Sequence, residues 1–487
     1  MYTSTVAGIR ELEKKAVDSG VPEYELMRRA GVMAAAWIEA MFPDAGRFVV
    51  VAGGGNNGGD ALVAAANLTS APVKVFAVKP LSEYSGCAAK AAMDLPENIP
   101  VTVKKELCSS DLQPGDVIID GLLGIGFSGE RVRENIANSI EVINRSHLPV
   151  AALDLPSGIN GDTGKAAENG VVKAYCTLTF GAVKTGLITA SGSAYRGCLR
   201  LLDIGLAHGQ ESGEAVFTNV DAVKVFPEIP VNCHKNSRGR VTVWGGSPEY
   251  PGAAALAAEA ALKSGAGIVR CASEADLSGR LKNAVIFRKL SGGDYPEDFF
   301  ANSDVLVCGC GWGSCAGKDK LQKALSFHGV TVLDADALNC VSQHPEVWQK
   351  RHDVIITPHP GEAERLRVAA GLAVAGSRRE LAAELALYYG AVTVLKGRDT
   401  VVASPAGEVF TVVAGSQLLA TAGSGDVLAG VIGALAGQPG ISPLEAALLG
   451  VYAHGAAGEG KDHILIADEL PEIVSCKLQK IRYNNFI

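Results

Sequence analysis

The stretch Phe48-Val-Val-Val-Ala-Gly-Gly-Gly-Asn-Asn-Gly-Gly-Asp60 has the pattern of a buried strand that runs into a glycine-rich turn. Strong helix formers follow it over residues 61–68. Glycine lets the backbone approach a bound group closely, and the free amides at the start of a helix attract anions. The stretch therefore predicts an α/β fold with an anion-binding turn at a strand end.

The glycines of this turn also satisfy G-x-G-x-x-G, the pattern of dinucleotide-binding folds, over residues 53–58. Such folds carry an acidic residue about 20 residues further on, at the end of the second strand, where it binds ribose hydroxyls. Here the next apolar run, residues 73–78, ends in Lys79 and Pro80. This difference argues against an NAD-dependent dehydrogenase, although the glycine pattern keeps that alternative open.

Short continuous apolar runs recur along both halves of the chain. Such runs are typical of parallel strands that are covered on both faces. The expected strands are residues 48–51, 73–78, 117–119, 149–153, 241–244, 304–307, 330–333, 354–356 and 392–395. Because helical stretches lie between them, both halves are predicted to be α/β with largely parallel sheets.

The length of 487 residues, at roughly 100–200 residues per domain, indicates two or three domains. A polar stretch near residues 208–214 precedes a segment with two prolines and the basic stretch His234–Arg240. We place the boundary near residue 212 and predict domains over residues 1–212 and 213–487. The two halves carry different motifs and no repeat, which indicates a fusion of unlike units.

The charge and hydropathy patterns exclude two classes of partner. Lysine and arginine total 44 against 52 acidic residues, which gives a net charge of −8 and no sequence-wide attraction for nucleic acid or an anionic membrane. No apolar run approaches the ~18 residues that a membrane span needs. We expect neither nucleic acid nor a membrane as partner, although a local basic pocket is compatible with this composition.

The cysteines favour a reducing compartment. Eleven of them, an odd number, are scattered along the chain, and we expect them to be buried small residues in a cytoplasmic protein. The one cluster, Cys308, Cys310 and Cys315, lacks the paired spacing of zinc ligands. We therefore expect a tight loop after a buried strand there.

Polar side chains end two further strands in the first half. Asp120 follows residues 117–119, and Asp154 and Ser157 follow residues 149–153. In a doubly wound sheet the ligand crevice lies outside the carboxyl ends of the strands. These residues are therefore expected to lie near the turn that ends at Asp60.

In the second half, Ala420-Thr-Ala-Gly-Ser-Gly-Asp-Val-Leu-Ala-Gly430 opens a helix of small apolar residues. The amides of its glycine turn can bind a transferring phosphoryl group while Asp426 takes a proton from an attacking hydroxyl. Polar groups again follow strands, at Asp334 and over residues 357–362 and 396–400. The Walker pattern G-x-x-x-x-G-K-[ST] does not occur, which excludes a P-loop kinase.

Taken together, Asn56–Asp60, Asp120 with Leu122-Leu-Gly, and Asp154-Leu-Pro-Ser-Gly resemble the epimerase domain of NAD(P)H-hydrate repair enzymes. The resemblance covers roughly residues 1–212 and implies a Rossmann-like three-layer αβα fold. It implies K⁺ at Asn57, Asp120 and Ser157, whose oxygen donors suit a hard cation. The implied site for the hydrated nucleotide comprises Asn56, Asn57, Gly58, Gly59, Asp60, Gly124, Ile125, Gly126, Phe127, Ser128, Gly129, Glu130 and Asp154.

Asp154 is the expected catalyst of epimerisation, because inverting one carbon by proton chemistry requires a positioned acid or base. Lys184 also matches the family, either as a phosphate ligand or as a turn cap. Ile125 departs from the family, which usually has Thr there, so one hydroxyl near the loop is lost.

The second half resembles the ribokinase-like dehydratase domain of the same family over about residues 213–487, which implies a ribokinase-like αβα fold. The matching motifs include His234-Lys235, Tyr250-Pro-Gly-Ala253, Asp334–Asn339, Thr357–Glu362 and Asp426. By this resemblance the adenine nucleotide binds at Lys396, Gly397, Arg398, Asp399, Thr400 and Gly425. The hydrate binds at Ala253, Gly313, His359 and Asp426.

Two departures occur in this half. Ser424 replaces the usual Thr, and Ser416-Gln-Leu-Leu419 stands where the family tends to have Asn-Pro-Gly-Met. Because the hydroxyl is kept and only one polar contact is lost, we expect a changed affinity and an active site.

The two domains in this order imply epimerisation of the R and S hydrates NADHX and NADPHX, followed by dehydration of the S form. ADP would donate the phosphoryl group and give AMP and phosphate, with Asp426 as the base and Mg²⁺ neutralising phosphate charge. The expected partners are these small molecules and, in a homo-oligomer, further copies of the chain. A small-molecule kinase and a non-catalytic nucleotide sensor remain alternatives. The sequence leaves ADP against ATP, and NADH hydrate against NADPH hydrate, undecided.

Overall fold

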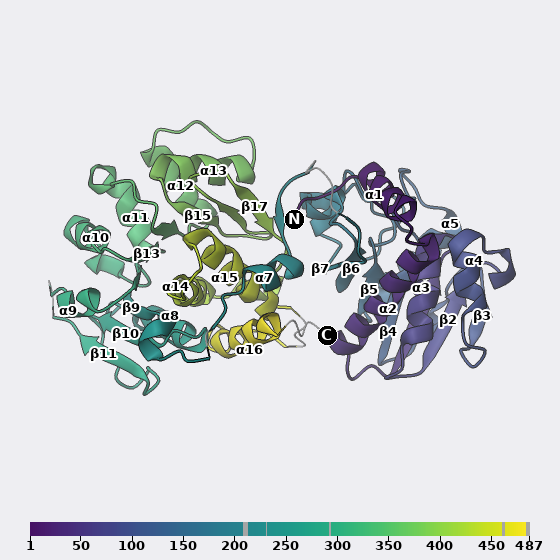
Figure 1. Ribbon diagram of the computed structural model, residues 1–487, viewed down its shortest axis with the longest axis horizontal. Coiled ribbons are helices and arrows are strands. Elements are labelled where there is room, and N and C mark those ends of the chain that lie inside the picture. The colour runs from purple at the N-terminus through teal and green to yellow at the C-terminus, as the bar shows by residue number, and fades with distance from the viewer. Residues whose placement is uncertain (208–212, 230, 292–293, 460–462, 484–487) are drawn as a thin grey trace. The chain divides into compact units, whose positions relative to one another are not determined.

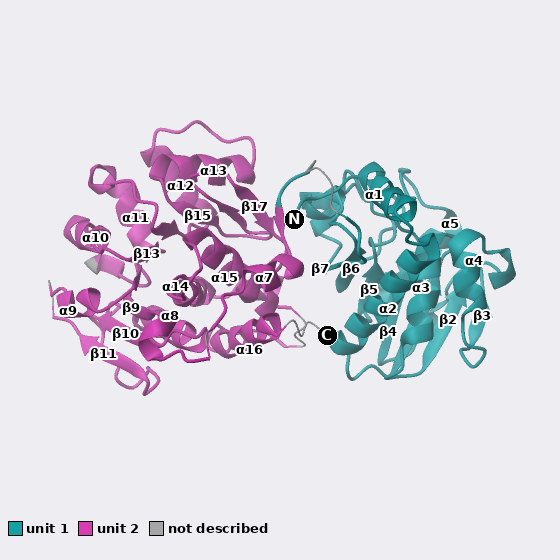
Figure 2. Cartoon of the chain, in the orientation of Figure 1, with its two compact units in different colours: residues 1–215, 486–487 teal, residues 216–485 magenta. Residues whose placement is uncertain are grey.

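The structure of the chain, a computed structural model, describes residues 1–207, 213–229, 231–291, 294–459 and 463–483. These residues divide into two compact units (Figure 2). The first unit comprises Met1–Ala215, and the second begins at Val216. The predicted boundary near residue 212 lies outside the described residues.

The first unit contains a seven-stranded sheet in the order β3-β2-β1-β4-β5-β6-β7, in which all neighbouring strands are parallel (Figure 1). Its strands are β1 (Arg47–Ala52), β2 (Val73–Ala77), β3 (Val101–Val103), β4 (Asp116–Gly121), β5 (Val150–Leu153), β6 (Cys176–Phe180) and β7 (Cys198–Leu202). The four strands predicted in this half are confirmed.

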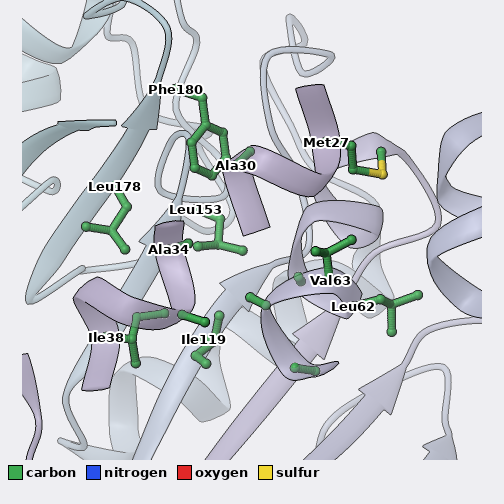
Figure 3. Close-up of a cluster of buried hydrophobic side chains, with 14 of the residues drawn as sticks. Met27, Ala30, Ala34, Ile38, Leu62, Val63, Ile119, Leu153, Leu178 and Phe180 are labelled. Atoms are coloured by element: carbon green, nitrogen blue, oxygen red, sulfur yellow. The ribbon is translucent and has the colours of Figure 1, made fainter. Parts of the chain in front are cut away.

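Helices cover both faces of this sheet. They are α1 (Val6–Asp18), α2 (Glu23–Met41), α3 (Asn56–Asn67), α4 (Gly86–Met93), α5 (Glu134–Ser146) and α6 (Ala190–Ser193). Because side chains alternate along a strand, Phe48 and Val50 of β1 pack in the cluster with α2 and α3, whereas Val49 and Val51 pack with α5. Figure 3 shows the first of these clusters, with Ile38 of α2 near Ile119 of β4. The predicted three-layer αβα fold is confirmed.

The second unit contains a ten-stranded sheet in the order β11-β10-β9-β12-β13-β14-β15-β16-β17-β8. Its strands are β8 (Val216–Phe217), β9 (Arg240–Trp244), β10 (Ile268–Ser273), β11 (Val285–Lys289), β12 (Val305–Cys308), β13 (Val330–Leu333), β14 (Val354–Ile356), β15 (Val392–Leu395), β16 (Val401–Ala403) and β17 (Val409–Val412). The pairs from β11 to β15 are parallel, and β16 is antiparallel to both of its neighbours. All five strands predicted in this half are confirmed.

The helices of the second unit also form two layers (Figure 1). They are α7 (Asn219–Val225), α8 (Pro251–Lys263), α9 (Glu297–Ala301), α10 (Lys318–Leu325), α11 (Asp336–Gln343), α12 (Pro360–Ala369), α13 (Arg378–Tyr389), α14 (Ser424–Ala436), α15 (Pro443–Ala457) and α16 (Leu470–Arg482). Helices α10 to α13 pack on one face of the sheet, and α8, α14 and α15 contact the strands from the other.

Helix α14 lies unusually close to its neighbours because it is rich in glycine. A Cβ at Gly433 would lie 2.4 Å from Val307 Cγ2 of β12, and one at Gly430 would lie 2.1 Å from the Ala257 carbonyl oxygen of α8. Neither position has room for a side chain. This packing fixes the N-terminus of α14 over the carboxyl ends of the central strands.

Two observations concern the chain as a whole. Over the described ranges, no helix combines the length and the apolar composition that crossing a membrane requires. Most described cysteines are buried, as expected, whereas Cys108 and Cys476 are exposed, so the prediction of buried cysteines is wrong for these two.

Candidate active sites

The glycine turn after β1 is pressed against the neighbouring strand end. A Cβ at Gly53 would lie 1.9 Å from the Leu122 carbonyl oxygen, and one at Gly58 would lie 1.8 Å from the Gly53 carbonyl oxygen. Helix α3 begins at Asn56, five residues before the run of helix formers that starts at residue 61. The residues up to Asp60 therefore lie in the first helical turn and not in a loop, because Gly55 serves as the N-cap.

Asn57, Asp120 and Ser157 share one hydrogen-bond network. The Ser157 hydroxyl donates to Asp120 Oδ1 at 2.6 Å, and the Ser157 amide donates to Asp120 Oδ2 at 2.8 Å. Asn57 Nδ2 donates to the Leu123 carbonyl oxygen at 2.8 Å, and the Leu123 amide donates to Ser157 Oγ at 2.8 Å. The structure thus brings these three predicted residues together at the carboxyl ends of β1, β4 and β5.

Two features of this network fit a monovalent cation. Asn57 Oδ1 is buried and, in the part of the chain that the structure describes, has no hydrogen-bond partner. Burial raises the pKa of Asp120 to about 6, although hydrogen bonds from Ser157 and Leu122 oppose the shift. A bound cation would supply the missing partner of Asn57 and would favour the ionised form of Asp120. The oxygen donors therefore fit K⁺.

Asp154 forms a buried ion pair with Lys184. Lys184 Nζ also donates to Thr179 Oγ1 at 3.1 Å and to the Phe180 carbonyl oxygen at 2.8 Å, which uses all three N–H bonds of an ammonium group. Lys184 thus bonds the Phe180 carbonyl oxygen of its own turn and holds Asp154, and its role toward a phosphate stays a prediction. Asp154 has a φ of 63°, a strained backbone conformation that is common at functional sites.

Two further carboxyl groups lie near this ion pair. Burial raises the pKa of Asp60 well above its usual range, and the negative charge of Asp154 raises it further. Burial also raises the pKa of Glu13 on α1, although the Lys184 charge opposes that shift. Asp60 was predicted as a substrate ligand. Glu13 was missed because it lies among other charged residues of a surface helix, where the sequence gives no distinguishing signal.

The loop of predicted ligands from Gly124 to Glu130 is only partly joined to this site. A Cβ at Gly124 would lie 3.1 Å from Asn57 Cβ, so the loop starts against the network. Ile125 and Phe127 are half-buried, whereas residues 128–130 are exposed. Glu130 forms an ion pair with Lys165 at 3.2 Å. The structure therefore places the end of this loop at the surface.

In the second unit, the predicted glycine turn opens α14. Gly423 is the N-cap with a φ of 89°, and Gly425 and Asp426 lie in the first turn. Across the described residues, their two amides donate to no acceptor outside this helix. A Cβ at Gly425 would lie 3.4 Å from Lys396 Nζ and 3.7 Å from Asp334 Oδ2. Available amides, an ammonium group and a carboxylate thus meet at one point, where an anion can bind.

Lys396 and Asp334 form an ion pair across the carboxyl edge of the sheet. Lys396 Nζ lies 2.6 Å from Asp334 Oδ1, and the Thr357 hydroxyl donates to the same oxygen at 2.7 Å. Lys396 Nζ is also 3.9 Å from Glu362 Oε2. The residue that the sequence assigned to the nucleotide therefore lies beside the catalytic candidates.

Asp426 lies next to this ion pair and titrates near neutrality. Burial raises the pKa of Asp426 to about 7, and the charge of Asp334 adds to the rise. The Cys310 thiol, in the loop after β12, donates a hydrogen bond to Asp426 and opposes the shift. One donor atom from each of Cys310, Asp334 and Asp426 lies within 4.8 Å of the others. A carboxyl group with such a pKa can accept a proton at physiological pH, as a general base must.

The same cluster does not form a site for Mg²⁺. This ion requires hard oxygen ligands, whereas Cys310 offers sulfur, and burial raises the pKa of its thiol well above the usual range. Asp334 already accepts hydrogen bonds from Lys396 and Thr357. These three residues therefore form no cage for the predicted Mg²⁺, which stays a prediction.

The glycine-rich loop after β12 has the predicted tight form. A Cβ at Gly309 would lie 1.9 Å from the Asp334 carbonyl oxygen, so this loop crosses the next strand end at close range. The Gly313 amide donates to Asp336 Oδ2 at 2.8 Å. A Cβ at Gly311 would lie 2.9 Å from Ala253 Cβ, which places the predicted ligand Ala253 against this loop.

The remaining predicted ligands of this unit have local partners. His359 Nδ1 accepts the Gly361 amide at 3.0 Å and so caps α12. The loop over residues 397–400 joins β15 to β16 and is held by Arg378, whose guanidinium donates to the Arg398 carbonyl oxygen at 2.6 Å. Neither contact tests binding of a ligand, so the assigned roles stay predictions.

The two departures from the family pattern contact each other. The Ser424 hydroxyl donates to the Leu419 carbonyl oxygen at 2.8 Å. Leu419 ends a short 3₁₀ turn that begins at Gln417. The hydroxyl kept at position 424 thus ties the altered segment to the start of α14.

Comparison with known proteins places these two sites in one family. Residues 23–186 match a family model described as YjeF-related protein N-terminus, and residues 241–480 match one described as NAD(P)H-hydrate dehydratase. The chain is 38% identical over 481 residues to the bifunctional NAD(P)H-hydrate repair enzyme Nnr of Coxiella burnetii, covering 95% of this chain and 96% of the relative. Its identity to the Escherichia coli enzyme of the same name is 36% over 468 residues, covering 93% of this chain and 88% of the relative.

A solved structure shows the same fold as part of the chain. This is a ribokinase-like superfamily protein from Enterococcus faecalis, which is 24% identical, has a TM-score of 0.50 and aligns over 56% of this chain and 98% of its own. The likeness confirms the predicted ribokinase-like fold. With full-length relatives and both domain matches in order, the chain belongs to the family of bifunctional NAD(P)H-hydrate repair enzymes.

Proposed function

We propose that the chain repairs hydrated NADH and NADPH in two steps, with one active site in each unit. The first unit interconverts the R and S epimers, and the second dehydrates the S form with ADP as phosphoryl donor. The description of the family matched by residues 241–480 supports the second assignment. The observation that carries the proposal is Asp426, whose pKa is raised by burial to about 7 in the turn that offers its amides to a phosphoryl group.

Dehydration needs activation because hydroxide is a poor leaving group. Asp426 accepts the proton of the C6 hydroxyl while the hydroxyl oxygen attacks the terminal phosphorus of ADP. The bond between that phosphorus and the bridging oxygen breaks, which releases AMP. The amides of Gly425 and Asp426 stabilise the charge on the transferring group. Loss of the C5 proton and cleavage of the C6–O bond then release phosphate and form the C5–C6 double bond of the dihydronicotinamide.

Epimerisation needs proton transfer without group transfer. C6 of the hydrate carries both a hydroxyl group and the ring nitrogen, so removing the hydroxyl proton while the C6–N bond opens gives an aldehyde. Closure on the other face, with the proton returned, inverts C6. Asp154 takes and returns this proton, and Lys184 holds its carboxylate in place. K⁺ held by Asn57, Asp120 and Ser157 would supply positive charge for the phosphate groups of the substrate.

The direct test is to incubate the purified chain with hydrated NADH and either ADP or ATP. We expect the absorbance of the dihydronicotinamide to return and orthophosphate to be released in equal amount. A small-molecule kinase would instead accumulate a phosphorylated product. A nucleotide sensor would bind ligand without turnover. The donor, the preferred hydrate, homo-oligomerisation and a cytoplasmic location stay predictions.

A further inference from the structure

A cavity in the second unit lies at the end of α14 opposite to Asp426. The C-terminal ends of α8 and α14, helix α16 and the segment before β9 line it, and its volume is about 50 Å³. Since one water needs roughly 10–15 Å³ in this measure, the cavity can hold several waters or one small anion. Helix α14 has 13 residues, which separates its two ends by about 18 Å. The cavity is therefore distinct from the catalytic turn.

Positive charge dominates the lining of this cavity. Arg238, Lys263 and Arg482 line it, and no acidic residue is among its described lining residues. Lys263 is neutralised by an ion pair with Glu472. Within the described ranges, neither Arg238 nor Arg482 forms an ion pair with a carboxylate. Two guanidinium charges thus remain without a counter-ion among the residues that the structure describes.

Three polar atoms of the lining also have no hydrogen-bond partner among the described residues, namely Arg238 Nε, Ser264 Oγ and Gln438 Oε1. Ser264 is 8% and Gln438 is 6% exposed, so both side chains are removed from bulk water. Gln438 Nε2 donates to the carbonyl oxygens of Arg238, Gly265 and Ala434 at 3.0, 3.1 and 3.3 Å. Because only the amide nitrogen can face three carbonyls, Gln438 Oε1 is fixed as an acceptor.

The helix ends at this cavity do not repel an anion as strongly as bare helix C-termini would. The carbonyl oxygens of Ala434 in α14 and of Gly265 just after α8 already accept from the Gln438 amide group. Their partial negative charge is therefore partly compensated inside the protein. What remains open in the cavity is two guanidinium groups, one hydroxyl donor and one carboxamide acceptor.

We propose that this cavity binds hydrogen phosphate. Arginine is the preferred protein partner of such an oxyanion, and Arg238 Nε and the Ser264 hydroxyl can donate to its oxygens. The one O–H group of hydrogen phosphate can donate to Gln438 Oε1, which a fully ionised anion such as sulfate cannot do. A volume of about 50 Å³ matches a small anion of this size. The site goes beyond the proposed repair reaction, no step of which uses it.

The test is calorimetric titration of the full chain with inorganic phosphate, in excess ADP and without hydrate, so that the catalytic turn is occupied. We expect one equivalent of phosphate to bind. Arg238→Gln and Arg482→Gln should each weaken binding at least tenfold, and Arg482 is exposed, so its replacement should leave the fold intact. Arg280→Gln is the matched control, because Arg280 is exposed in the same unit and does not line the cavity.

Two competing anions test the chemistry of the site. Sulfate should bind about tenfold more weakly than phosphate, since it leaves the buried Gln438 acceptor unpaired. AMP should not displace phosphate, because its phosphate is esterified and the cavity matches a small free anion in volume. Phosphate binding that is absent in the presence of ADP, or that is unchanged in both arginine variants, would overturn the proposal. Equal affinity for sulfate would overturn the assignment of the proton donor. Phosphate binding is measured without hydrate, so its result does not depend on whether the chain repairs hydrate. A failure of this proposal can therefore be told apart from a failure of the proposed function.

Discussion

The two units place a buried lysine differently in otherwise similar strand-end sites. In the first unit, Lys184 is paired with Asp154, the carboxylate assigned to catalysis. In the second, Lys396 is paired with Asp334, the neighbour of the catalytic candidate Asp426. The first arrangement holds its carboxylate as half of an ion pair, and the second leaves Asp426 to titrate near neutrality.

This difference matches the two proposed reactions. Epimerisation needs a carboxylate that exchanges a proton reversibly with one bound molecule, whereas phosphoryl transfer needs a base that is free to accept a proton beside an anion. A lysine paired directly with Asp426 would compete for that role. Because Lys396 is paired with Asp334 instead of Asp426, its positive charge stays near the phosphoryl group and Asp426 stays available as the base.

The largest expected effect is that of Asp426→Asn. The amide cannot accept the hydroxyl proton, so dehydration should fall by roughly 10²–10⁴-fold while the fold is retained. Epimerisation in the other unit should keep its wild-type rate. The measurement is return of dihydronicotinamide absorbance from S hydrate, with epimer exchange followed by chromatography. Normal dehydration by this variant would show that Asp426 is not the base.

Lys184→Met should be nearly as damaging, but to the other activity. Asp154 would be left buried without its partner, which we expect to lower the free energy of unfolding by about 3–5 kcal/mol and the epimerase rate by roughly 10²-fold. Dehydration of S hydrate should be unchanged. Urea denaturation and the epimerase assay measure the two effects.

The matched control is the double variant Lys184→Met with Asp154→Asn. Removing both charges eliminates the unpaired buried carboxylate, so much of the lost stability should return without activity. A double variant no more stable than Lys184→Met would contradict the ion pair as the source of the loss.

A smaller effect is expected from potassium. Replacing K⁺ by Li⁺ should lower epimerisation roughly tenfold, since Asn57 Oδ1 loses its partner, and should leave dehydration unchanged. Asn57→Ala should lower epimerisation in K⁺ and abolish the difference between the ions. Asn67→Ala, on the same helix but exposed, is the control. An undiminished response to K⁺ in Asn57→Ala would rule out this ligand set.

The smallest effect concerns the pH dependence of dehydration. Burial raises the pKa of Asp426 to about 7, and the ionised form is the base, so kcat/KM should rise with pH through about 7. Cys310→Ala removes a hydrogen bond that favours the ionised form, so the rise should move to higher pH by roughly 0.5 units. Cys310→Ser keeps a donor and should not move it upward. A profile that is identical in Cys310→Ala would show that the thiol does not tune this carboxyl.

Much of the fold was predictable because central parallel strands are continuous apolar runs. Two of the strands that were missed break this pattern: β6 contains the fully buried Thr177 and Thr179, and β10 contains Arg270. The hairpin of β16 and β17 was missed because it lies outside the parallel part of the sheet, where the apolar runs are short. Tertiary burial, which propensity does not include, decided these elements.

The sequence predicted which strand ends carry polar groups and therefore where the candidate sites lie. Asp120 and Ser157 meet because the carboxyl ends of neighbouring parallel strands meet, and Asp334 meets Asp426 because α14 begins beside the end of β13. The partners of these groups were not predictable. The pairing of Asp154 with Lys184, and the thiol of Cys310 on Asp426, depend on side-chain positions that residue types alone do not specify.

The central claim is that two separate sites act in sequence through a diffusing S hydrate. The most direct test uses pure R hydrate, ADP, and the variants Asp154→Asn and Asp426→Asn. Each variant alone should regenerate the dihydronicotinamide no faster than uncatalysed epimerisation allows, and an equimolar mixture of the two should restore rapid regeneration. A mixture as slow as the separate variants, or rapid regeneration by either variant alone, would contradict the account.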